Sequence, residues 1–88
     1  MCRDVKLEYA ISEVRDGVMA AARKHRPYAS AHEAYAVILE ELEEFWSEVI
    51  KKKEDRNSEV LLGELRDIAS ASVKAIVDLG LIDDVIPM

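Results

Sequence analysis

The sequence has few of the residues that cross-link chains or interrupt helices. It contains a single cysteine, Cys2, so no intramolecular disulfide can form, which fits a protein of the reducing cytoplasm. Three glycines and two prolines are too few to divide the chain, and no low-complexity stretch or internal linker is visible. The segment MCRDVKLEYA mixes charges of both signs without a continuous apolar run, so we expect neither a signal peptide nor a membrane span.

Positive charge is also in deficit. The formal net charge at pH 7 is -6, from 12 lysines and arginines against 18 aspartates and glutamates. Non-specific binding to a nucleic-acid polymer needs a basic face, so the composition argues against that function. An acidic protein can still bind a nucleotide when metal ions mediate the contact.

The residues that are abundant favour helices. Half of the chain is hydrophobic and 34% is charged, and 88 residues are enough for one small domain, residues 1–88. Apolar residues recur at spacings of three and four in three segments, which predicts helices over about 4–25, 30–53 and 58–79. We therefore predict an all-α fold, a three-helix chain in a helical bundle with short connections.

Signals for helix ends agree with these ranges. Ser30, followed three residues later by Glu33, is typical of a capping box at the start of the second helix. Asn57 and Ser58 are alternative N-cap residues for the third helix, and Gly80 is placed to end it as a C-cap glycine. Residues 54–58 have little apolar content and are predicted to form the turn between the second and third helices.

The second and third helices carry apolar residues outside their main stripes. A three-helix monomer would leave much of this surface in water. We therefore predict a homo-oligomer, most simply a dimer that completes a four-helix core. The additional apolar residues are Val37, Leu39, Trp46 and Ile50 in the second helix and Leu62, Val73 and Val77 in the third.

Two pairs of acids carry the chemical signal. Glu41 with Glu44, and Glu64 with Asp67, are three residues apart, which places each pair on one helix face. Both pairs lie at the border of the apolar stripes, with Glu64 about 40° from Ile68 around the helix. Residues 45–63 allow one helix to end, turn and return antiparallel, which brings the pairs level. Four acids at one point require a divalent cation between them.

A structural explanation of the acids stays open beside the chemical one. The second helix also contains Glu40, Glu43 and Glu48, and such runs are common in bundle helices because glutamate is a good helix former and keeps a surface soluble. A lone pair of acids at this spacing has almost no specificity. The second pair, at a suitable distance from the first, gives the metal interpretation its weight.

The acidic pattern resembles that of the MazG-like, all-α nucleoside triphosphate pyrophosphohydrolase family. The family motif is E-x-x-E, a helix turn, then E-x-x-D. Here it reads ELEE from Glu41 to Glu44 and ELRD from Glu64 to Asp67, with Glu40 as the acid that often precedes the first pair. The segments EELEEFWSEV and GELRDIASA also resemble family members, and the similarity covers roughly residues 32–79.

The resemblance implies an activity and a set of roles. Such enzymes split a ribo- or deoxyribonucleoside triphosphate into a monophosphate and pyrophosphate with Mg²⁺, for which Mn²⁺ is the alternative ion, and they form homodimers or dimers of dimers. Carried over to this chain, the resemblance makes Glu41, Glu44, Glu64 and Asp67 metal ligands. Glu40 becomes either a further ligand or the residue that orients the attacking water, so Glu40 and Glu41 are the catalytic candidates. Neither a nucleic-acid polymer nor a membrane is an expected partner.

Three residues are candidates for binding the substrate. Lys51 is placed to hold a phosphate, although a basic last helical turn is the ordinary explanation. Lys74 follows Asp67 by two turns on the same face, so it either reaches a phosphate or is a solvated lysine. Trp46 offers a ring for stacking on a base, with packing or an interface as the commoner role.

Two other functions compete with catalysis. The chain fits a non-catalytic helical oligomerisation or regulatory module of the same fold, since it is short and has no recognisable base pocket. Metal binding without hydrolysis, as in di-iron helical bundles, is less favoured because His25 and His32 lack the required spacing from a glutamate.

Overall fold

The chain folds into three α-helices. The computed structural model describes residues 1–87. In chain order the elements are α1 (Arg3–Lys24), α2 (Ala31–Val49), a single 3₁₀ turn (Lys53–Asp55) and α3 (Ser58–Asp78). No residue from 1 to 87 lies in a strand, which confirms the predicted all-α class.

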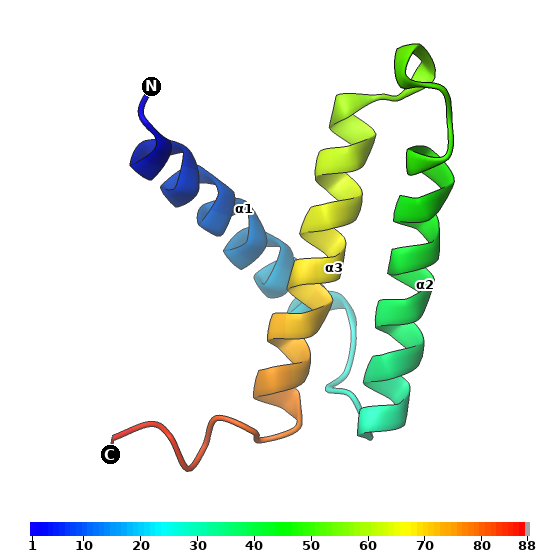
Figure 1. Ribbon diagram of the computed structural model, residues 1–88. Coiled ribbons are helices and arrows are strands. Elements are labelled where there is room, and N and C mark those ends of the chain that lie inside the picture. The colour runs from blue at the N-terminus through cyan, green and yellow to red at the C-terminus, as the bar shows by residue number, and fades with distance from the viewer. Residues whose placement is uncertain (88) are drawn as a thin grey trace.

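The helices form a hairpin with one crossing arm. The helices α2 and α3 run side by side in opposite directions, and α1 packs on α3 but not on α2 (Figure 1). The C-terminal half of α1 makes this contact, while its N-terminal half projects away from the other helices (Figure 1). The hairpin brings the middle of α2 level with the middle of α3, as the antiparallel return predicted.

The predicted signals for helix ends are largely present. The hydroxyl of Ser30 accepts the N–H of Glu33 at 3.1 Å, which is half of a capping box. The Glu33 carboxylate turns instead to the guanidinium of Arg26 and to the N–H of Ala29. At the other end of the hairpin, Asn57 is the N-cap of α3, because its Oδ1 accepts the N–H groups of the next turn.

Gly80 ends α3 as predicted. Its φ of 69° lies in the left-handed region that favours glycine. The N–H of Leu81 bonds to the carbonyl of Ile76 at 3.1 Å, and the N–H of Gly80 bonds to the carbonyl of Val77 at 3.1 Å. This pair of bonds is the Schellman arrangement, which satisfies the last carbonyls of the helix.

The helix α2 ends earlier than the sequence predicted, at Val49 rather than near residue 53. The guanidinium Nε of Arg56 donates to the Val49 carbonyl at 3.0 Å, and the buried Glu48 carboxylate accepts the N–H of Asn57 at 2.9 Å. These bonds draw residues 50–57 across the end of the hairpin toward α3. The basic residues at 51–53, which were predicted to form the last turn of this helix, therefore belong to the connection between α2 and α3.

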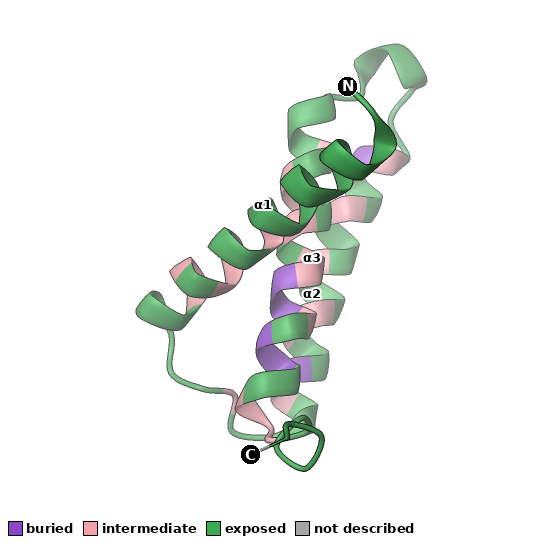
Figure 2. Cartoon of the chain, turned by 90° about the vertical axis from the view of Figure 1, so that its left-hand side faces the viewer, coloured by how far each residue is buried: buried purple, intermediate pink, exposed green. Residues whose placement is uncertain are grey.

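The core of the described chain is thin. The only buried hydrophobic residues among residues 1–87 are Ala34, Ala71 and Ala75. Buried positions follow α3 and the facing side of α2, whereas α1 is mostly exposed (Figure 2). Large apolar side chains of α2 and α3 stay half-exposed, including Leu42 at 49% and Leu65 at 50%. The hairpin thus lacks the large buried side chains that normally stabilise a domain.

A glycine allows α1 to approach α3 closely. A Cβ placed on Gly17 would collide with the hydroxyl of Ser70, which itself donates to the carbonyl of Val14 at 3.2 Å. The helices therefore cross at a glycine of α1 and a serine of α3, with the side-chain stem of Arg66 beside them. This crossing sets where the C-terminal end of α1 lies relative to α3.

The substitution Gly17→Ala is expected to weaken this crossing. The new methyl forces Ser70 to rotate away and lose its hydrogen bond, so the free energy of unfolding falls by about 1–2 kcal/mol despite the better helix propensity of alanine. Gly63→Ala is the matched control on α3, since the nearest neighbour of its Cβ is an arginine tip at 3.8 Å, and it should be neutral or stabilising. Urea unfolding of both variants checks this, and equal stability of the two would contradict the close crossing.

None of the three helices within residues 1–87 combines the length and the apolar content that a bilayer crossing requires.

Candidate metal centre

Three carboxylates from two helices meet at the middle of the hairpin. Glu41 on α2 and Glu64 with Asp67 on α3 each offer one oxygen, and these oxygens lie within 4.8 Å of one another. We call these three residues the acid cluster. The antiparallel pairing of α2 and α3 positions them, because it sets one turn of each helix opposite the other.

Two oxygens of the acid cluster are buried without a partner. Glu41 Oε2 and Glu64 Oε2 are shielded from solvent and accept no hydrogen bond from any described residue. A buried carboxylate oxygen normally has a hydrogen-bond donor or a cation, because leaving it unpaired costs free energy. The donor set is made entirely of oxygens, which suits a hard divalent cation such as Mg²⁺.

Charge repulsion and burial are visible in the pKa values. Burial, followed in order of effect by the neighbouring carboxylates of Glu44, Asp67 and Glu64, raises the pKa of Glu41 to about 7. Burial and the Glu44 carboxylate likewise raise the pKa of Glu64. The site therefore disfavours its own ionised form when it holds no counter-charge.

Of the four predicted metal ligands, Glu44 is the one outside the acid cluster. Its side chain is exposed, although its charge acts on both Glu41 and Glu64. Glu40, the other catalytic candidate, is exposed on α2 and is not among the carboxylates that converge. The structure thus brings together three of the predicted acids and leaves two beside them.

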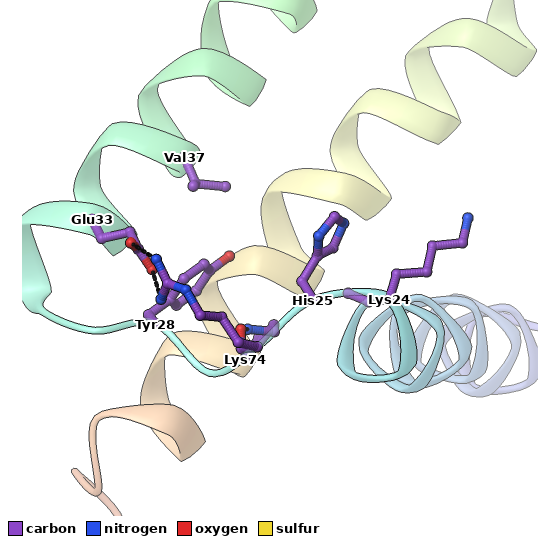
Figure 3. Close-up of a pocket in the computed structure, with 8 residues that line it drawn as sticks. Lys24, His25, Tyr28, Glu33, Val37 and Lys74 are labelled. Carbon is purple, nitrogen blue, oxygen red and sulfur yellow. Dashed lines mark hydrogen bonds and ion pairs between the residues drawn. The ribbon is translucent and has the colours of Figure 1, made fainter.

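A groove runs from the acid cluster along the end of α1. One part has a volume of about 360 Å³ and is lined by Glu41 and Asp67 together with residues from α1 and the following loop. A second part of about 410 Å³ continues past the loop toward Glu33. The two parts share Ala21, Lys24, His25, Tyr28 and Val37, so they form one continuous depression, whose loop end is drawn in Figure 3.

Lys74 is engaged in the fold. Its side chain is only 4% exposed, and its ammonium group donates to the Asp78 carboxylate and to the carbonyl of Arg26 at 3.1 Å. The ammonium also lies 3.9 Å from the centre of the Tyr28 ring. The N–H of Tyr28 donates to the same carboxylate at 3.1 Å. Neither predicted role applies in this structure, since the lysine is neither free for a phosphate nor solvated.

These contacts tie the loop between α1 and α2 to α3. The hydrogen bond from Lys74, and then the Tyr28 N–H, lower the pKa of Asp78 against the opposing effect of burial. The residues involved are about 50 positions apart in sequence, so the network is tertiary. We call Lys74, Asp78, Tyr28 and the Arg26 carbonyl the loop anchor.

Lys51 and Trp46 lie apart from the groove. Lys51 pairs with Glu48 at 2.9 Å at the end of α2, two turns beyond Glu41. Trp46 is 60% exposed and lines a separate, wholly apolar groove with Leu42, Phe45, Val49 and the stem of Glu43. The structure brings neither residue to the acid cluster.

Sequence reasoning missed the residues that organise the site. Glu48 is buried, and its carboxylate joins the end of α2 to the start of α3 through Lys51 and Asn57, which lower its pKa. In the sequence, the only indication of this role was that Glu48 lies on the same helix face as Glu41 and Glu44. Asp78 had a clearer signal, since a lysine four residues earlier is a helical ion-pair spacing.

The ionisation of Glu41 should make the metal-free protein less stable at neutral pH. Its folded pKa of about 7 exceeds the ordinary 4.5, so the folded state binds more protons between these values and the free energy of unfolding falls as pH rises through them. Glu41→Gln removes this effect and should stabilise the metal-free protein by on the order of 1–3 kcal/mol at about pH 8 and little at about pH 4. Chemical unfolding in EDTA at both pH values measures it, and an equal effect at both would contradict the crowding.

Comparison with known proteins adds no family assignment. No protein-family model, no curated protein and no solved structure matches this chain. We therefore base the functional proposal on the geometry of the acid cluster and its groove.

Proposed function

We propose that this chain is a Mg²⁺-dependent nucleoside triphosphate pyrophosphohydrolase of the MazG-like type. One observation carries the proposal: Glu41, Glu64 and Asp67 converge from two helices, and two of their oxygens are buried with no partner. Solubility alone does not explain acids whose oxygens are removed from water. The order of the acids along the chain is that of the family motif.

The residues present suit the chemistry of the proposal. Glu41, Glu64 and Asp67 would hold the ion, and Glu44 stands next to them with a further carboxylate. A bound Mg²⁺ neutralises triphosphate oxygens and lowers the pKa of a coordinated water. Phosphoryl chemistry of this kind depends mainly on positioning and charge stabilisation, so it requires no nucleophilic side chain. Mn²⁺ also binds carboxylate oxygens, so we expect it to substitute for Mg²⁺ in this site.

The direct test is product analysis with a panel of ribo- and deoxyribonucleoside triphosphates in Mg²⁺. Monophosphate and pyrophosphate should appear in equal amounts, and no diphosphate should form. Absence of pyrophosphate from every substrate, in a folded preparation, would sink the proposal. Stability that does not depend on metal would then favour the helical oligomerisation module instead.

We also propose that the chain works as a homo-oligomer, most simply a dimer. The exposed surface of the single chain is 7065 Å². A compact monomer of 9.9 kDa exposes about 5,200 Å². The excess is larger than the ~800 Å² per partner of a standard interface and falls in the range of obligate dimers.

The extended shape of the single chain also supports oligomerisation. Its radius of gyration is 14.9 Å, against about 12 Å for a compact domain of this length. The outer faces of α2 and α3 carry half-exposed apolar side chains, among them Leu42, Trp46, Leu62 and Val77. A second copy covering these faces would supply the core that the single hairpin lacks.

Trp46→Glu is expected to convert the oligomer into monomers. A charge placed in the apolar groove of α2 would have to be buried at the contact, which costs several kcal/mol. His32→Glu, at the exposed start of α2, is the control and should leave the mass unchanged. Light scattering coupled to size exclusion gives the mass directly. A wild-type mass of one chain, or a Trp46→Glu variant with the wild-type mass, would contradict this interface.

A further inference from the structure

The groove beside the acid cluster has basic side chains on the wall that faces the acids. The last turn of α1 and the residue after it place Lys24 and His25 along the same depression as Glu41 and Asp67. Oxygen ligands and nitrogen donors thus face one space. A groove of this volume lies within the range of small-molecule sites.

Two of the four basic residues in the groove are already neutralised. Arg26 makes a bidentate pair with Glu33, at 2.9 and 2.7 Å, and Lys74 is held by Asp78. Lys24 and His25 differ, because neither side chain has a hydrogen bond or an ion pair with any of residues 1–87. In Figure 3 the side chains of Lys24 and His25 lie apart from that of Glu33, at the end of α1.

The position of these two residues is fixed from both sides. On one side α1 crosses α3 at the close contact of Gly17 with Ser70. On the other side the loop anchor holds the residues that follow His25, through the Arg26 carbonyl and Tyr28. The helix that carries Glu64 and Asp67 therefore also positions the end of α1, so one helix contributes to the placement of both walls.

We propose that Lys24 and His25 form an oxyanion subsite for the diphosphate part of a ligand whose metal ion is held by the acid cluster. The proposal rests on the proposed function for the metal, and it adds the residues that take the phosphates. Lys24 supplies a cation and His25 a ring N–H donor, while the ion on the acids neutralises the opposite side of the same ligand. The metal ion and the two basic side chains would together balance the negative charge of the diphosphate, which neither wall of the groove can balance alone.

Binding of Mg²⁺-pyrophosphate, measured by calorimetry on the full chain, tests the subsite without any hydrolysis. The variant Lys24→Ala/His25→Gln should bind pyrophosphate at least tenfold more weakly than the wild type. The matched control Lys52→Ala/His32→Gln removes the same residue types from exposed positions outside the groove, and it should bind normally. Binding of Mg²⁺ alone should be the same in all three proteins.

A triphosphate analogue with a methylene bridge between its α- and β-phosphorus atoms identifies the source of the diphosphate. Tighter binding of the analogue than of pyrophosphate assigns a nucleotide, and equal binding assigns a free polyphosphate. Wild-type affinity for pyrophosphate in the Lys24→Ala/His25→Gln variant, or no binding by the wild type, would overturn the subsite. Pyrophosphate binding through Lys24 and His25 without hydrolysis of any triphosphate would reject the proposed function alone.

Discussion

Glu41→Gln and Asp67→Asn are each expected to lower nucleoside triphosphate hydrolysis at least about 1,000-fold, which corresponds to about 4 kcal/mol of lost transition-state stabilisation. Each substitution removes one negative charge from the acid cluster, whose oxygens lie within 4.8 Å of one another. An amide keeps the size of the side chain but is a weaker ligand for a divalent cation. Steady-state rates over a range of Mg²⁺ concentrations measure the loss.

The fold should survive both substitutions, because they relieve repulsion among acids. Circular dichroism and the oligomeric mass should therefore match the wild type. Glu54→Gln, in the exposed 3₁₀ turn, is the control with the same change of charge and should keep full activity. Hydrolysis within a few fold of wild type in Glu41→Gln would remove the acid cluster from the mechanism.

Asp78→Asn is expected to produce the largest loss of stability, about 3 kcal/mol, because breaking a buried ion pair leaves its partner as an uncompensated charge. The side chains of Lys74 and Asp78 are only 4% and 13% exposed. Asparagine retains an acceptor for the N–H of Tyr28, so the effect reports the charge of Lys74 rather than the loss of the loop hydrogen bond. Urea unfolding measures the change.

The double variant Lys74→Met/Asp78→Asn separates charge from packing. It removes the buried charge while it keeps the stem of the side chain and the acceptor, so most of the lost stability should return. A double variant as unstable as Asp78→Asn would mean that the lysine contributes through its contacts with the Arg26 carbonyl and the Tyr28 ring. Asp78→Asn with wild-type stability would contradict the loop anchor.

Helical periodicity and end signals were enough to predict most of the fold. Ser30, Asn57 and Gly80 act through hydrogen bonds between residues at most five positions apart, so their local sequence determines their roles. The end of α2 was missed because it depends on bonds from Arg56 and Asn57, which lie beyond the helix. The sequence around the lysines at 51–53 contains no trace of those contacts.

In the candidate site, too, the features set by local sequence could be predicted and those set by tertiary contacts could not. The approach of Glu41 to Glu64 and Asp67 follows from helical spacing and an antiparallel turn, and both are visible in the sequence. The burial of Lys74 could not be predicted from helical spacing, because it requires the loop after α1 to fold over this side chain. The place of Lys24 beside the acids likewise depends on the crossing of α1 with α3, which no local pattern encodes.

The acid cluster as a divalent-cation site is the central claim, and the dependence of the unfolding temperature on Mg²⁺ tests it most directly. A ligand that binds only the folded state raises this temperature by mass action. NaCl at equal ionic strength must be the reference, since salt also screens the repulsion among the acids. We predict that Mg²⁺ stabilises the wild type beyond this reference and that Glu41→Gln and Asp67→Asn abolish the difference. Equal unfolding temperatures in Mg²⁺ and in NaCl, or the same extra stabilisation in both variants, would contradict the claim.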